Sequence, residues 1–336
     1  MKHDLIARAA RALLCLPLAA CATAPLAEAG PAAAGEPEVR RNVVYGTGLV
    51  DASTVPRERD LLLDAYLPAV PGAEAAPAII MVFGGAYHRG TKEAVSFVED
   101  GAQDSSMADY CAMFARNGIA CFAIEYRLTP EDPAFPAEFE TALTVPKALL
   151  EDPGATARIE HVRRLMGLAP LDEVSREQYW AASFAAVADT QTALSHIRQQ
   201  VAVYGIDPDR IALGGFSAGA VTVLNLAYGA GADVSAVVSI SGGIWGHDVT
   251  ATAARGQPPL LLFAGQTDLP GMRWGSSELA KLFAARGIPV ETAWVPGFGH
   301  FYPMGATSLG PDFTKESVEE RILKFLNRHF QASTAP

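Results

Sequence analysis

Three side chains that could together cleave an acyl bond each stand just beyond an apolar run. Ser217 lies in the pattern Gly-x-Ser-x-Gly, Asp268 follows the run 259–264, and His300 follows the run 290–295. A serine hydroxyl becomes a nucleophile when a histidine takes its proton and a carboxylate orients that histidine. We therefore expect Ser217 to attack a carbonyl carbon, with His300 as the general base and Asp268 as the acid that orients it.

Other histidines and acids compete for the two supporting roles. Four of the seven histidines are set aside by position, because they lie at the N-terminus or in helical patterns: His3, His161, His196 and His329. His88 and His247 each follow an apolar run and stay alternatives to His300. Glu131 and Asp312 stay alternatives to Asp268. The positions of His300 and Asp268, after the last two predicted strands, favour them over these alternatives.

Acyl transfer also needs backbone N–H groups aimed at the oxygen on which negative charge develops. The apolar run 78–83 opens into Gly84, Gly85 and Ala86, and glycine lets the backbone approach a substrate closely. We expect Gly85 and Ala86 to donate to that oxygen, together with Ala218 directly after the serine. The alternative interpretation of the paired glycines is an ordinary turn after a strand.

Short apolar runs bounded by Gly, Pro and Asp recur along the chain and predict strands. They are residues 42–45, 61–67, 78–83, 120–124, 210–214, 234–240, 259–264 and 290–295. Between several of these runs, apolar residues recur with a helical period, as in 187–201 and 318–326. Strands that alternate with helices predict an α/β fold, with a mostly parallel sheet flanked by helices on both faces.

The alternation breaks once, over residues 131–185, where proline-flanked segments have helical spacing and no strand pattern. This stretch predicts a small helical insertion after the fourth strand, on the side of the sheet where ligands bind in open α/β folds. As a lid it would shape the pocket for the acyl or alcohol part of a substrate. The alternative is packing that has no part in the site.

The N-terminal residues have the pattern of an export signal. Residues 1–20 carry three basic side chains and then an apolar run too short to span a bilayer. The sequence Leu-Ala-Ala-Cys that ends at Cys21 resembles a bacterial lipobox, in which the cysteine becomes lipidated. We expect an Ala/Pro-rich tether over 21–38, a folded domain over 39–331 and a lipoprotein anchored in the bacterial envelope, facing the periplasm or exterior. A plain signal peptide cut near Ala29 is the alternative.

Composition narrows the partners. Without residues 1–20 the chain has 23 basic and 36 acidic residues, a formal charge of −13, and no basic tract. This balance argues against nucleic acid and against a polybasic membrane-binding surface, which leaves the lipid as the anchor. Cys111 and Cys121 lie in apolar segments, which favours free core thiols, with a disulfide as the alternative. No Cys/His cluster has zinc-binding spacing, and we expect neither a metal nor an organic cofactor.

One segment resembles a known signature. Residues 126–131 read Tyr-Arg-Leu-Thr-Pro-Glu and 135–137 read Phe-Pro-Ala, similar to the Y-R-L-x-P-E…F-P-A of hormone-sensitive-lipase-like and related bacterial carboxylesterases. Residues 207–211, ahead of the serine, resemble their D-P-x-R-I. The resemblance implies the α/β-hydrolase fold, in which Gly-x-Ser-x-Gly forms a nucleophile elbow. It also implies hydrolysis of carboxylic esters through an acyl-enzyme, with the triad and oxyanion donors named above.

Two departures from the family pattern stand out. The family's H-G-G-G loop reads Phe83-Gly-Gly-Ala86 here. Ala86 keeps its N–H, but a positive φ at this position would be strained, and Tyr126 or Arg127 would have to hold the loop in place of the histidine. The roughly 45 residues added after residue 137 are the second departure.

A peptidase or amidase on the same fold and a non-catalytic envelope protein are the rival hypotheses.

Overall fold

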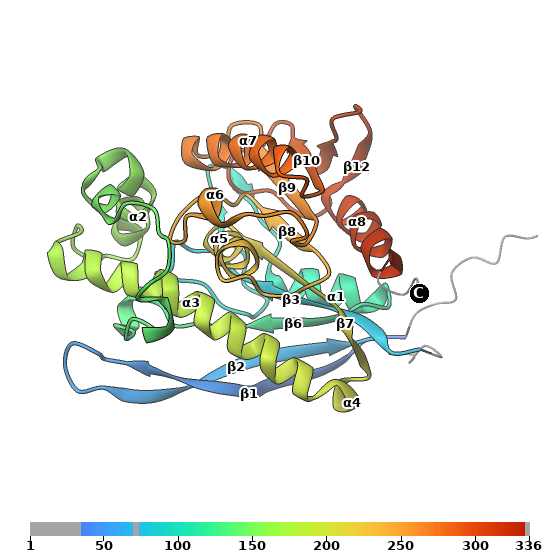
Figure 1. Ribbon diagram of the computed structural model, residues 1–336, viewed down its shortest axis with the longest axis horizontal. Helices are drawn as coiled ribbons and strands as arrows, with labels where there is room; N and C mark the ends of the chain where they lie inside the picture. Colours follow the sequence, from blue (N-terminus) through green and yellow to red (C-terminus); the bar gives the residue numbers. More distant parts are fainter. Residues whose placement is uncertain (1–34, 70–73, 333–336) are drawn as a thin grey trace, which may run out of the picture. The chain divides into compact units, whose positions relative to one another are not determined.

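A ten-stranded sheet forms the centre of the protein in the computed structural model, which describes residues 35–69 and 74–332 (Figure 1). Its strand order is β1-β2-β6-β3-β7-β8-β9-β10-β11-β12. The strands are β1 (Glu38–Val50), β2 (Arg57–Leu67), β3 (Ala76–Val82), β6 (Ala120–Ile124), β7 (Ile206–Phe216), β8 (Val237–Ile240), β9 (Leu260–Gly265), β10 (Val290–Val295), β11 (Thr307–Leu309) and β12 (Lys315–Ser317). A separate hairpin pairs β4 (Val98–Glu99) with β5 (Ala102–Gln103).

The strands from β6 through β10 are parallel, and the pairs at both edges of the sheet are antiparallel. Every residue of β6, β8 and β9 is buried, so helices and loops cover both faces of the sheet at its centre. All eight predicted runs form strands, and the prediction of a mostly parallel sheet flanked by helices is confirmed. The short strands β4, β5, β11 and β12 were missed, because two or three residues are too few to show an alternating pattern.

Eight α-helices accompany the sheet in the described part of the chain. They are α1 (Met107–Arg116), α2 (Pro153–Leu165), α3 (Glu173–Gln199), α4 (Val201–Tyr204), α5 (Ala218–Leu224), α6 (Val249–Thr252), α7 (Pro270–Ala285) and α8 (Val318–Ala332). Helix α1 packs against β6, α5 against β7 and β8, and α7 against β9 and β10. Within 35–69 and 74–332, no helix is both long enough and apolar enough to cross a bilayer.

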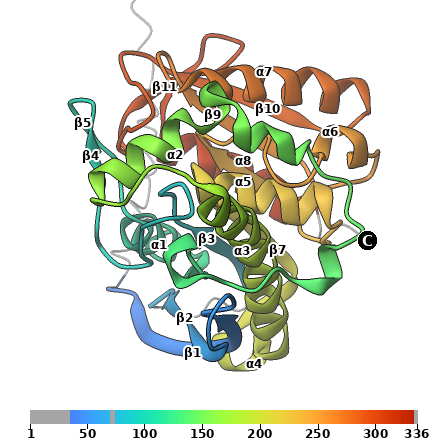
Figure 2. The same ribbon diagram turned by 90° about the vertical axis from the view of Figure 1, so that its left-hand side faces the viewer.

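The predicted insertion at 131–185 begins at the end of the 3-10 turn Thr129–Glu131 and contains 3-10 turns at Ala137–Phe139 and Lys147–Glu151, followed by α2. Its predicted end at 185 lies inside α3, which continues without a break to Gln199 because its buried apolar side chains recur along the whole helix. In Figure 1, α2 stands to the left of the strands beside the N-terminal part of α3, and Figure 2 looks onto it from that side.

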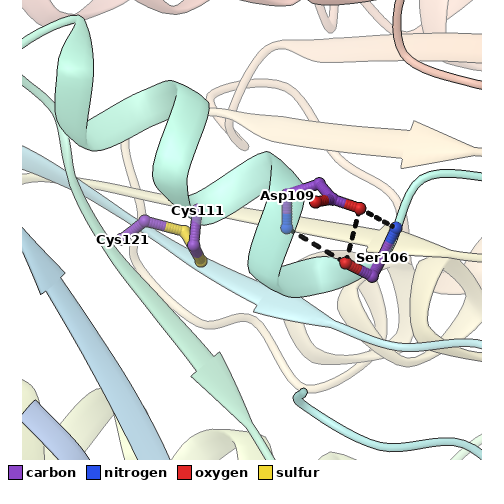
Figure 3. The surroundings of a disulfide bond; sticks show 4 residues. All are labelled: Ser106, Asp109, Cys111 and Cys121. Carbon is purple, nitrogen blue, oxygen red and sulfur yellow. Dashed lines mark hydrogen bonds between the residues drawn. A yellow bond between two sulfur atoms is a disulfide. The ribbon is translucent and has the colours of Figure 1, made fainter. Parts of the chain in front are cut away.

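Helix α1 is joined covalently to β6. A capping box between Ser106 and Asp109 begins the helix, and one turn later Cys111 forms a disulfide with Cys121 (Figure 3). The prediction of two free core thiols was therefore wrong. The sequence shows two buried apolar positions but not that α1 lies directly on β6, which brings the two Cα atoms to 5.0 Å.

Candidate active site

Ser217 occupies the sharp turn between β7 and α5, with φ 52° and ψ −117°. Its two flanking glycines are required by close backbone approach. A Cβ on Gly215 would lie 2.5 Å from the carbonyl of Gly219, and a Cβ on Gly219 would lie 2.0 Å from the carbonyl oxygen of Val82. A non-glycine residue at positive φ is strained and persists only where its surroundings fix it. The turn thus holds the Ser217 hydroxyl out from the carboxyl end of β7.

The structure brings Ser217, His300 and Asp268 together in one hydrogen-bonded row. His300 Nε2 lies 2.8 Å from Ser217 Oγ, and His300 Nδ1 lies 2.7 Å from Asp268 Oδ1. All three residues are buried. Because a carboxylate only accepts, Nδ1 carries the proton and donates to Asp268, which leaves the lone pair of Nε2 to accept the serine proton. This is the geometry that activates a serine for nucleophilic attack.

The Asp268 carboxylate receives four hydrogen bonds, so its position is fixed on both oxygens. Oδ1 accepts from His300 and from the N–H of Leu269 at 2.7 Å. Oδ2 accepts from the hydroxyl of Ser241 at 2.5 Å and from the N–H of Gly265 at 3.2 Å. These four donors fix the orientation of the carboxylate beside the histidine ring.

Sequence reasoning missed Ser241 and Tyr302, which extend the row beyond the carboxylate. Ser241 follows β8 directly and has φ 52°, and its hydroxyl lies 2.9 Å from the hydroxyl of Tyr302. Burial, followed by the negative charge of Asp268, raises the pKa of Tyr302 well above its usual value. Because Ser241 gives its one hydroxyl proton to Asp268, the phenol donates to Ser241 Oγ. The signal that could have found Ser241 is its place at a strand end next to the strand that carries Asp268.

The alternative histidines and acids make other contacts. His247 packs against the rings of Phe139 and Phe184, and His88 bonds the carbonyl of Ala86. Glu131 accepts from the N–H of Leu128 and pairs with Arg59, while Asp312 accepts from Thr314. None of these four has a hydrogen bond to Ser217 or to His300 within the described residues.

The loop after β3 carries the expected oxyanion donors. Gly85 and Ala86 both have positive φ, 121° and 53°. Ala86 therefore has the strained conformation that the sequence analysis considered. The N–H groups of Gly85, Ala86 and Ala218 donate to no group in the part of the chain that the structure describes. Ala86 and Ala218 line a pocket with Ser217, whereas Gly85 does not line it. Two residues whose N–H groups are unpaired in the described part of the chain, Ala86 and Ala218, therefore line the same pocket as the serine.

Tyr126 holds the start of this loop where the family pattern has a histidine. Its hydroxyl donates to the carbonyl of Phe83 at 3.0 Å, and the two rings stack with centroids 4.3 Å apart. Arg127, the other candidate for this role, turns away and makes a bidentate ion pair with Asp189. The phenylalanine at position 83 thus contributes a stacking surface in place of a polar side chain.

The pocket at Ser217 has a volume of about 210 Å³ and is mostly apolar. Its remaining lining residues are Tyr87, Leu149, Ala155, Arg158, Ile159, Tyr179, Val221, Ile244, Trp245, Gly271, Met272 and Trp274. Helix α2 and the turn before it contribute four of these residues, so the segment 147–165 forms part of the pocket wall. In the described part of the chain, no group of three or more His, Cys, Asp or Glu side chains is placed to hold a metal ion.

Comparison with known proteins places this fold. Residues 63–144 and 175–233 match the family model described as BD-FAE, and 145–174, which include α2, lie between the matched stretches. Thermogutta terrifontis esterase 2 phosphorylated by paraoxon is similar at 18% identity and a TM-score of 0.51, covering 90% of this chain and 96% of that one. A truncated carbohydrate esterase from gut microbiota is similar at 17% identity and a TM-score of 0.55, covering 90% and 99%.

A third solved structure is the α/β hydrolase MGS-M1 from a Medee basin deep-sea metagenome library, at 15% identity and a TM-score of 0.55, covering 88% of this chain and 99% of that one. No curated protein sequence matches the chain. At this level of identity the solved structures show the fold, and the prediction of an α/β-hydrolase fold is confirmed.

Proposed function

We propose that this chain, an α/β-hydrolase by fold, is a serine hydrolase that cleaves carboxylic esters through an acyl-enzyme. The observation that carries the proposal is the hydrogen-bonded row from Ser217 through His300 to Asp268, which opens onto a pocket with two unpaired N–H donors. The esterases among its structural neighbours support the same reaction.

The proposed first half-reaction forms the acyl-enzyme. His300 Nε2 takes the proton of Ser217 as Oγ bonds to the ester carbonyl carbon, and Asp268 stabilises the imidazolium that results. The N–H groups of Ala86 and Ala218 stabilise the oxyanion, with Gly85 as a third donor if substrate binding turns its N–H toward that oxygen. The tetrahedral intermediate collapses as His300 gives the proton to the leaving alkoxide, which departs as the alcohol.

The second half-reaction hydrolyses the acyl-enzyme. Water gives a proton to His300 as its oxygen bonds to the acyl carbon, and His300 then returns that proton to Ser217 Oγ as the carboxylic acid leaves. Each proton taken by His300 is given back within the same half-reaction, so the cycle needs no other reactant. A water-excluding apolar pocket strengthens the interactions that stabilise the oxyanion.

A panel of p-nitrophenyl esters from acetate to palmitate, each paired with the matching p-nitroanilide, tests this function. We expect turnover of the esters with kcat/KM falling as the acyl chain outgrows a pocket of about 210 Å³, and turnover of the anilides lower by at least about 100-fold, the size of effect that a well-placed catalytic proton transfer has on rate. Equal or faster anilide cleavage would favour the peptidase or amidase alternative. An absence of turnover on every member would reject the proposal.

We further propose that the protein is exported and anchored through a lipid on Cys21, although this residue lies outside the described part of the chain. The disulfide between Cys111 and Cys121 supports export, because such bonds persist mainly in oxidising compartments. Intact mass spectrometry of the protein from its native envelope should find an N-terminus at Cys21 with a diacylglycerol modification. An unmodified N-terminus beyond Cys21 would contradict the anchor.

A further inference from the structure

The loop that carries the proposed oxyanion donor is costly to form. Ala86 and Tyr87 are consecutive non-glycine residues with φ 53° and 56°, a conformation that disfavours each by about 1–2 kcal/mol. Relaxation of either residue would rotate the peptide groups around Ala86 and move its N–H away from the serine. Contacts elsewhere must therefore hold the carbonyls of both residues.

Each carbonyl has its own anchor. The Tyr87 carbonyl accepts from the N–H and the hydroxyl of Thr129, at 2.7 and 2.9 Å. The Ala86 carbonyl lies 2.8 Å from Nδ1 of His88, and no other partner for it exists in the described ranges. His88 thus holds Ala86, which lines the pocket at Ser217.

Arg163 of α2 determines which nitrogen of His88 carries the proton. An Arg163 guanidinium nitrogen lies 3.1 Å from His88 Nε2, and guanidinium groups only donate. Nε2 must therefore accept, which puts the proton on Nδ1, where it donates to the Ala86 carbonyl. Arg163 is fixed in turn by donating from Nε to the carbonyl of Ala169 at 2.7 Å.

The surroundings keep His88 neutral. His88 is 1% exposed and Arg163 is 8% exposed, and the ring of Tyr179 stacks on His88 with centroids 5.8 Å apart. Burial lowers the pKa of His88 to about 4; the hydrogen bond to the Ala86 carbonyl opposes this shift, the charge of Arg163 adds to it and Glu160 opposes it. Arg163 and Glu160 of α2 and Tyr179 of α3 are the charged and titratable groups facing the ring, so His88 is neutral at pH 7.

We propose that Arg163 and His88 are positioning residues for ester hydrolysis, through which the inserted helix α2 holds the oxyanion loop. Arg163 fixes the Nδ1–H tautomer of His88, and His88 clamps the Ala86 carbonyl so that the Ala86 N–H stays beside Ser217. The same helix supplies Ala155, Arg158 and Ile159 to the pocket wall. The proposal rests on the proposed esterase function, and it makes the inserted segment part of the catalytic arrangement.

Two substitutions of His88 separate its two hydrogen bonds. In His88→Asn the amide nitrogen takes the place of Nδ1 and keeps a donor to the Ala86 carbonyl. In His88→Gln the amide oxygen takes the place of Nε2 and keeps only the acceptor for Arg163. Loss of one oxyanion donor lowers kcat by about 10²–10³-fold, and a displaced donor accounts for part of that. We expect His88→Gln to lower kcat for p-nitrophenyl butyrate at least 10-fold with KM changed less than 3-fold, and His88→Asn to keep at least a third of kcat, by the same reasoning.

Substitutions in α2 test the contact between Arg163 and His88. Arg163→Met should lower kcat about 10-fold without changing KM, because either tautomer of His88 then becomes accessible. Arg163→Lys, which keeps one cationic donor, should recover part of the loss. Arg164→Met, at the exposed neighbouring position, is the matched control and should be unchanged. Equal kcat values for His88→Asn and His88→Gln, with equal Tm values, would overturn the proposal.

A measurement without substrate keeps this inference separate from the esterase assignment. In ¹⁵N–¹H spectra of the full chain labelled at histidine, with the His88 resonances assigned from the His88→Asn variant, we expect a neutral Nδ1–H ring at pH 7. In Arg163→Met the same ring should populate both tautomers and titrate at a higher pH. An Nε2–H ring or a protonated ring in the wild type would refute the positioning role of Arg163 and His88 even if the esterase is active. An inactive enzyme with the expected spectra would refute the esterase function but not the hydrogen bond from His88 to the Ala86 carbonyl.

Discussion

Replacing Ser217 with alanine is expected to lower kcat for a p-nitrophenyl ester by about 10⁵- to 10⁶-fold, the size of loss seen when a triad nucleophile is removed. The expectation follows from the single short contact between Ser217 Oγ and His300 Nε2, at 2.8 Å. Without the hydroxyl, no covalent intermediate can form, and only water activated by His300 remains as a nucleophile. The loss should appear in kcat, since the pocket walls stay in place.

The alanine is compatible with folding, because the turn is shaped by Gly215 and Gly219 rather than by the serine side chain. Circular dichroism and thermal unfolding should therefore match the wild type. Ser195→Ala is the matched control, since that hydroxyl bonds the carbonyl of Gln191 within α3 and no other group in the described residues. Turnover by Ser217→Ala within 100-fold of the wild type would show that another group is the nucleophile.

Asp268→Asn is expected to cost about 10⁴-fold in kcat, because the amide cannot replace the carboxylate. Either orientation of the amide turns its NH₂ group toward an N–H donor, of Leu269 on one side or of Gly265 on the other. With the NH₂ toward His300, the imidazole proton is forced onto Nε2, and the ring can no longer accept the serine proton. With the NH₂ on the other side, the buried amide nitrogen faces the backbone donor of Gly265, and the Ser241 hydroxyl has to turn its proton away to accept from the amide.

Ser241→Ala provides the graded comparison for this prediction. It removes one of four hydrogen bonds to the carboxylate and leaves those from His300 and the backbone. We expect kcat to fall only about 3- to 10-fold, in line with the ~1 kcal/mol that one buried hydrogen bond contributes. Steady-state kinetics on both variants checks the pair. A loss for Asp268→Asn as small as that for Ser241→Ala would mean that the carboxylate does not orient the base.

The sequence predicted the parts of the site that follow strand ends. Ser217, Asp268 and His300 each come just after a strand of the parallel sheet, and the carboxyl ends of such strands meet at one edge. The positions of these residues along the sequence therefore predict that they lie close together. The strained Ala86 could be anticipated as well, because an alanine replaced glycine in a loop that needs positive φ.

The disulfide and the contacts of His88 depend on how helices pack against strands and loops, and no local sequence pattern predicts that packing. The disulfide required α1 to lie on β6 so that Cys111 faces Cys121. His88 returns to the Ala86 carbonyl because two consecutive residues with positive φ reverse the chain. Its contact with Arg163 also depends on where α2 packs, and the spacing of residues along the sequence does not predict the position of α2.

The most direct test of the central claim, that His300 and Asp268 activate Ser217 as a nucleophile, is labelling by a fluorophosphonate probe read by peptide mass spectrometry. The probe modifies activated serines and requires neither a known substrate nor turnover. The account predicts one adduct, on the peptide that contains Ser217, formed in Ser195→Ala as in the wild type and lost in Ser217→Ala. A wild-type protein that remains unlabelled, or an adduct on another residue that survives in Ser217→Ala, would contradict it.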